Sequence, residues 1–68
     1  MVMRVYEANL ARPDTIQRAL EARRAIERLG GKVEIGPPAP TGARLVRLIL
    51  PEPYKPDDVL PGLPFFPA

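Results

Sequence analysis

The sequence predicts an α+β fold, a small βαββ two-layer sandwich in which one helix covers one face of an antiparallel three-stranded sheet. Three observations predict it. One segment of seventeen residues repeats its apolar residues with helical spacing, and three shorter segments are rich in residues that favour strands. The last eighteen residues hold six of the ten prolines and three of the four aromatics. We therefore expect a core at residues 1–50 and a proline-rich, extended C-terminal arm at residues 51–68.

The first strand is expected at residues 2–8, where valine, methionine and tyrosine favour a pleated surface. The helix is expected at residues 13–29. Two starts fit the sequence, because Asp14 can cap the helix with Gln17 at capping-box spacing, or Pro13 can occupy its first position. A Gly-Gly pair then stops the helix. Its apolar arc spans about 220°, wider than one sheet face requires, which leaves room for a second chain on its other side.

Two more strands are expected at residues 32–36 and 43–50. The second of these is almost continuously apolar, which is typical of a strand buried on both faces. A right-handed crossover through the helix, followed by a hairpin, places this strand in the middle of the sheet, in the spatial order 2-3-1. The helix covers one face of the sheet, and the sequence contains no second long helix for the other.

The C-terminal arm is too apolar for a solvated tail and too rich in proline for a ladder or a long helix. Residues 56–60 can form one helical turn with Asp57 and Asp58 near its start, which explains this acidic pair better than acid–base catalysis or cation binding does. An extended arm reaches about 55 Å. We therefore expect it to pack across the uncovered sheet face, on its own core or on a partner subunit. The side chains expected to take part in self-association are Tyr54, Leu60, Leu63, Phe65 and Phe66.

Size and composition favour assembly. A chain of 68 residues gains only a few kcal/mol of net stability from one core. It has no cysteine for disulfides, and histidine is absent too, so no structural zinc site or other cofactor is expected. A homo-oligomer, most simply a dimer, is the expected state, and no other protein partner is indicated.

Location and habitat follow from the same composition. No window approaches the roughly 20 apolar residues of a membrane span, and the N-terminus lacks the pattern of a signal peptide. We therefore expect a cytoplasmic protein without membrane contact. Ten prolines, eight arginines against two lysines, and few thermolabile residues fit a thermophile.

The first functional hypothesis is a small structural or interaction module that self-associates through its sheet face and the C-terminal arm. The alternative is a nucleic-acid-binding or regulatory accessory protein whose basic helix face meets phosphates. The side chains that would do so are Arg18, Arg24, Arg28 and Lys32. Glu21 and Glu27 interleave with them, as on a solvated helix face, and no aromatic platform lies beside them for bases to stack on.

A third hypothesis is a minimal enzyme with a site at a subunit boundary, which would depend on Tyr6, Arg44, Arg47 or the acidic residues. Serine, cysteine and histidine are all absent, so the common nucleophiles and their usual base are missing. The glycines form neither a phosphate-binding loop nor a dinucleotide-binding fingerprint. No catalytic residue is therefore assigned.

Overall fold

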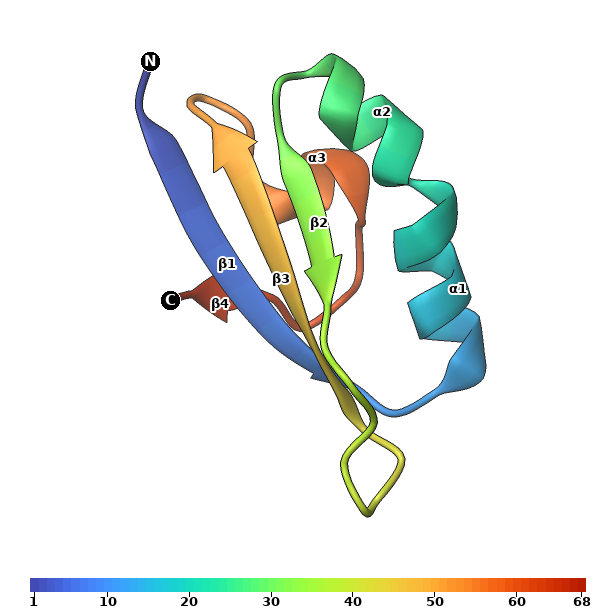
Figure 1. Cartoon of the computed structure of the whole chain (residues 1–68). Coiled ribbons are helices and arrows are strands. Elements are labelled where there is room, and N and C mark those ends of the chain that lie inside the picture. Colours follow the sequence, from blue (N-terminus) through green and yellow to red (C-terminus); the bar gives the residue numbers. More distant parts are fainter.

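The computed structural model describes all 68 residues. It is a small α+β fold built on one open antiparallel sheet of four strands, in the order β2-β3-β1-β4 (Figure 1). The strands are β1 (Met3–Leu10), β2 (Lys32–Ile35), β3 (Arg44–Pro51) and β4 (Phe66–Pro67). The helices are α1 (Pro13–Glu21), α2 (Arg23–Arg28) and the single turn α3 (Pro56–Val59). The α+β class is confirmed, but the expectation of only three strands is wrong.

The hydrophobic core lies on one face of the sheet, called here the core face. The most apolar strand, β3, lies between β1 and β2, and it pairs with β1 over eight residues. The strand residues buried on the core face are Ala8, Leu10, Val33, Val46, Leu48 and Leu50. Ala19 of α1 and Ile26 of α2 are buried against them, so both helices cover this face.

The expected single helix at residues 13–29 is instead two helices that meet at Ala22, where ψ is −9°. Neither proline nor glycine marks this position in the sequence. Pro13 occupies the first helical position, and Asp14 lies in the first turn. The proposed Asp14 cap is therefore wrong, because the carboxylate of Asp14 pairs instead with the guanidinium of Arg12, at 2.9 Å from Nη2.

The turn from α2 into β2 depends on two glycines. Gly30 has a φ of +90°, which favours glycine because it has no Cβ. Gly31 is needed for space. A Cβ there would lie 2.5 Å from the backbone oxygen of Ile49 and 2.9 Å from Cγ2 of Ile26. This close approach lets α2 pack down onto the middle of the sheet.

The C-terminal arm departs from the expected extended conformation. It forms α3 and then β4, and Leu60, only 2% exposed, belongs to the same core cluster as Ile26. The arm thus contributes to the core on the helix side of the sheet, and the expectation that it covers the other sheet face of its own chain is wrong. The boundary between residues 1–50 and 51–68 stays a prediction.

β4 can contain a proline because it is an edge strand, and one side of an edge strand needs no backbone partner. Phe66 lies opposite Glu7 and Pro67 lies opposite Tyr6. The amide of Ala68 then donates to the carbonyl oxygen of Val5 at 3.0 Å. Both ends of the described chain therefore meet at β1.

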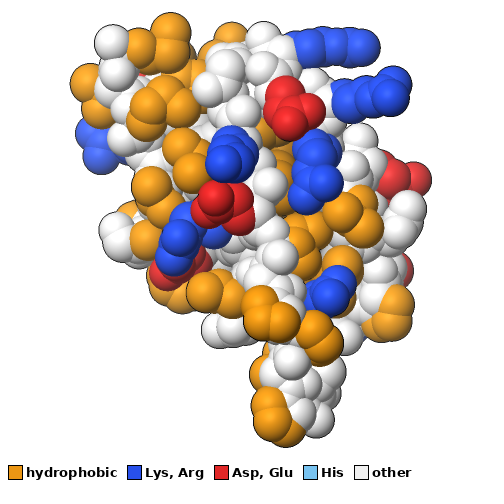
Figure 2. Space-filling model, in the orientation of Figure 1, with side chains coloured by type: hydrophobic (Ala, Val, Ile, Leu, Met, Phe, Trp, Pro, Cys, Tyr) orange, Lys and Arg blue, Asp and Glu red, His pale blue; other side chains and the backbone are white.

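No helix covers the other side of the sheet, called here the open face (Figure 1). Its side chains come from alternate positions of the three long strands. They are Met3, Val5, Glu7 and Asn9 of β1, Leu45, Arg47 and Ile49 of β3, and Lys32 and Glu34 of β2. Figure 2 shows this face, with alternating basic and acidic side chains crossing it between apolar ones.

Candidate functional site

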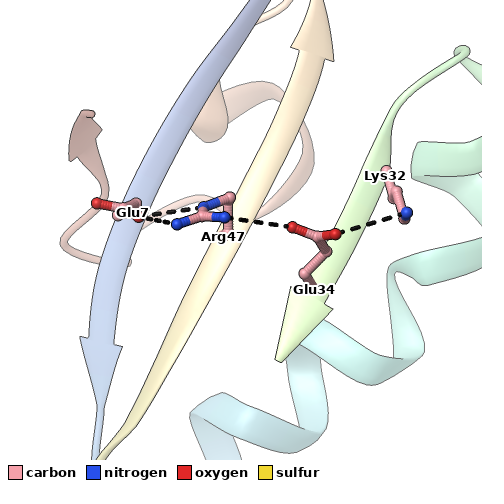
Figure 3. Close-up of polar contacts among 4 residues, drawn as sticks. All are labelled: Glu7, Lys32, Glu34 and Arg47. Atoms are coloured by element: carbon pink, nitrogen blue, oxygen red, sulfur yellow. Dashed lines mark hydrogen bonds and ion pairs between the residues drawn. The ribbon is translucent and has the colours of Figure 1, made fainter. Parts of the chain in front are cut away.

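A row of four charged side chains crosses the open face and is called here the charged row. In order from β1 to β2, they are Glu7, Arg47, Glu34 and Lys32 (Figure 3). Nη2 of Arg47 lies 2.9 Å from Oε2 of Glu7, and its Nη1 lies 3.7 Å from Oε1 of Glu34. Nζ of Lys32 lies 3.5 Å from Oε2 of Glu34. The signs therefore alternate along the row.

Strand register explains why these residues meet. Glu7 of β1 and Glu34 of β2 both lie directly opposite Arg47 of β3, on the same side of the sheet. Opposite charges in directly paired positions are favourable. The side chain of Arg47 is 47% exposed, so the row is accessible and its ion pairs are screened by water. The charged row thus contributes little to the free energy of folding, but it determines how charge is distributed over the open face.

Apolar side chains lie on both sides of the charged row. Leu45 is 41% exposed, Met3 is 43% exposed, and Phe66 beside Glu7 is 52% exposed. Singly exposed apolar residues are normal on a soluble protein. Here, however, they gather on the one sheet face that no helix covers.

A shallow hollow lies between β3 and β2 on the open face. Its volume is about 240 Å³. It is lined by Glu34, Ile35, Gly36, Leu45 and Arg47. Gly36 lies beside Leu45, to whose carbonyl oxygen its amide donates at 2.8 Å. The absence of a side chain at Gly36 leaves room there, so an exposed leucine stands next to a recess on the same surface.

A larger groove of about 560 Å³ lies at the other end of the sheet, where the turn after β3 meets the start of β1. Its lining is Arg4, Tyr6, Glu52, Pro53, Tyr54, Lys55 and Pro67. Arg4 forms an ion pair with Glu52 across it. The groove therefore offers a ligand two tyrosine rings and one ion pair. Tyr6 lines it, but Arg44 and Arg47 lie on opposite faces of β3, so the residues considered for a minimal enzyme do not converge.

The structure separates the five residues expected to take part in self-association. Leu60 is buried in the core, and Leu63 and Phe65 are partly buried against it. Tyr54 and Phe66 remain exposed. Only Phe66 lies beside the open face, since Tyr54 lines the groove. Self-association at these positions stays a prediction, for which Phe66 is the accessible contact next to the charged row.

The four basic residues considered for nucleic-acid binding come from three elements. Arg24 and Arg28 are exposed on α2, where basic side chains project from the surface in Figure 2. Arg18 of α1 donates from Nη2 to the carbonyl oxygen of Pro61 at 2.8 Å, so it holds the C-terminal arm. Lys32 belongs to the charged row. Two of the four therefore have partners within the chain.

Sequence reasoning missed the charged row as a unit. Glu7, Glu34 and Arg47 each looked like an isolated polar residue within an apolar strand, and only the register brings them together. One signal was present, because the face opposite the buried positions carries one charged residue in β1, one in β3 and two in β2. A strand alignment that maximised opposite-charge pairs would have found the row.

Other kinds of site find less support. No group of three acidic, histidine or cysteine side chains is placed to hold a metal ion. None of the three helices has both the length and the apolar character needed to cross a membrane. Comparisons of the chain with models of known families, with curated proteins and with solved structures found no match. The open face, with its charged row and exposed apolar side chains, is the surface that carries the functional argument.

Proposed function

We propose that this chain is a small interaction module that self-associates through the open face of its sheet. The observation that carries the proposal is the exposure of apolar side chains on the one sheet face without a helix. A two-layer fold buries one face of its sheet, and a second sheet packed about 10 Å away would bury the other. Phe66 brings the C-terminal arm to the border of this surface.

The size of the molecule is compatible with such an interface. Its two longer dimensions are 37 and 22 Å. A sheet face of that order can supply the roughly 800 Å² per partner that a standard-sized interface buries. For a chain with only ten buried residues, burying more apolar surface in a dimer would add appreciably to a small core.

The test compares two leucines of equal exposure. Leu45 on the open face and Leu20 on α1 are both 41% exposed. Sedimentation equilibrium of the wild type should show a dimer. Leu45→Lys should shift it towards monomer, because a charge would enter an apolar contact, while Leu20→Lys should leave it unchanged. A monomeric wild type at millimolar concentration, or dissociation by Leu20→Lys instead, would contradict the proposal.

A second function rests on the exposed arginines of α2. Arg24 and Arg28 have no acidic partner within 4 Å, so they can meet phosphates, and they carry the nucleic-acid alternative. The expected signature is salt-sensitive binding to a fluorescent oligonucleotide that is lost when both are changed to glutamate. Absence of wild-type binding at low salt would end this alternative without affecting the first proposal.

A further inference from the structure

We propose that two copies of this chain pack open face to open face about a two-fold axis that runs parallel to the strands, between Arg47 and Glu34. This inference rests on the proposed self-association and specifies its geometry. It follows from the order of charges in the charged row, which reads minus, plus, minus, plus from Glu7 to Lys32. Such a row changes sign when it is reversed end to end.

A two-fold axis parallel to the strands reverses the row of one copy over the row of the other. Arg47 then lies opposite the partner's Glu34. The backbone of Lys32 lies two residues along β2 from Glu34, and its long side chain brings the ammonium within reach of the partner's Glu7. Each contact occurs twice, because a two-fold interface is isologous. Every charge of the row, already paired within its own chain, meets an opposite charge of the partner. This matters because buried charges are costly unless they are paired.

The other two-fold arrangement has its axis along the row, perpendicular to the strands. Each residue would then lie opposite its own copy, so that Arg47 would meet the partner's Arg47 and Glu34 the partner's Glu34. Like charges brought together at an interface strongly disfavour association. The charged row therefore selects between the two ways of stacking the same pair of faces, and the strands of the two sheets run in the same direction in the favoured one.

Shape supports the same axis. Leu45 of β3 and Gly36 are neighbours across the strand pair, on either side of the proposed axis. The axis therefore places the exposed Leu45 over the partner's Gly36, which is the recess of about 240 Å³ described above. The same contact forms a second time in the opposite sense. The projecting side chain of Leu45 and the hollow that accepts it thus lie at equal distances from the axis, on opposite sides of it.

The first experiment exchanges the central charges. Arg47→Glu and Glu34→Arg should each raise the dimer dissociation constant about a hundredfold, because two attractive contacts become repulsive. An equimolar mixture of the two variants should form a heterodimer close to wild-type affinity, since Glu at 47 then faces Arg at 34 and the native Glu34 of one faces the native Arg47 of the other. Arg24→Glu on α2 is the control for a change of net charge alone. Circular dichroism of each variant verifies folding.

The second experiment uses the unmodified protein. A carbodiimide couples lysine amines to carboxylates that touch them, and mixing ¹⁴N- and ¹⁵N-labelled chains marks the links between subunits. Mass spectrometry should find Lys32 joined to Glu7 across the two labels. A monomeric wild type would overturn both the proposed function and this geometry. A dimer without that link, or a variant mixture that stays monomeric, would overturn the geometry alone.

Discussion

Replacing Leu60 with alanine measures how far the C-terminal arm is part of the core. Leu60 is 2% exposed and packs in the cluster that contains Ile26, Leu48 and Leu50. Truncating a buried leucine costs about 2–5 kcal/mol, from lost transfer energy and from the cavity that remains. A domain of this size has a total unfolding free energy of roughly 3–10 kcal/mol. We therefore expect Leu60→Ala to remove at least about a fifth of the stability, and about half at the middle of both ranges.

The assay is urea denaturation followed by circular dichroism, at one protein concentration for all variants because dimerisation would add to the apparent stability. The matched control is Leu20→Ala, the same chemical change at an exposed helix position, where alanine is at least as good a helix former. It should change the unfolding free energy by less than about 0.5 kcal/mol. If Leu60→Ala is as mild as Leu20→Ala, the arm is not a structural part of the core and the reasoning fails.

Three further predictions concern single contacts. Gly31→Ala should lower the free energy of unfolding by about 3 kcal/mol in urea denaturation, because the added Cβ would lie 2.5 Å from a backbone oxygen. Gly42→Ala should lower it by only about 1 kcal/mol, because a Cβ there would have no atom within 4 Å and only the φ of +87° is unfavourable. Equal costs for the two variants would contradict this reasoning. Asp58→Ala should lower the free energy of unfolding by about 1 kcal/mol, because it removes the 2.7 Å hydrogen bond that the carboxylate accepts from the amide of Lys55. When the two variants are compared by thermal melting, Asp57→Ala should be the milder change. Arg18→Ala should lower the free energy of unfolding by less than about 1 kcal/mol, since its hydrogen bond to Pro61 is exposed. Amide hydrogen exchange should nevertheless become faster around residues 60–63. Unchanged exchange there would show that Arg18 does not hold the arm.

Sequence reasoning could predict the parts of the fold that are set by local sequence pattern. The apolar run of β3, the Gly-Gly stop and the proline at the helix start each carry their physical cause within a few residues. These placed the strands of the core to within two residues at each end and put β3 in the middle of the sheet. The helical turn at Pro56 was likewise readable from a proline followed by two acids.

The features that could not be predicted depend on contacts between residues far apart in the sequence. β4 is two residues long, contains a proline and exists because Ala68 and its neighbours meet the free edge of β1. No property of those residues alone predicts a strand. The position of the arm was missed for the same reason, since Leu60 joins a core cluster whose other members are all distant from it in the sequence. The charged row needed the register of three strands at once.

The closure of the fold at β1 has a consequence for how the fold forms. Tyr6 pairs with Pro67, so two residues 61 positions apart in the sequence must meet before β4 exists. Until residue 60 has left the ribosome, the nascent chain has no side chain for the space that Leu60 occupies. Contacts of such sequence separation slow folding and lengthen the time during which apolar strands are exposed. The core is therefore expected to form in one step that the arm completes, rather than strand by strand as the chain emerges.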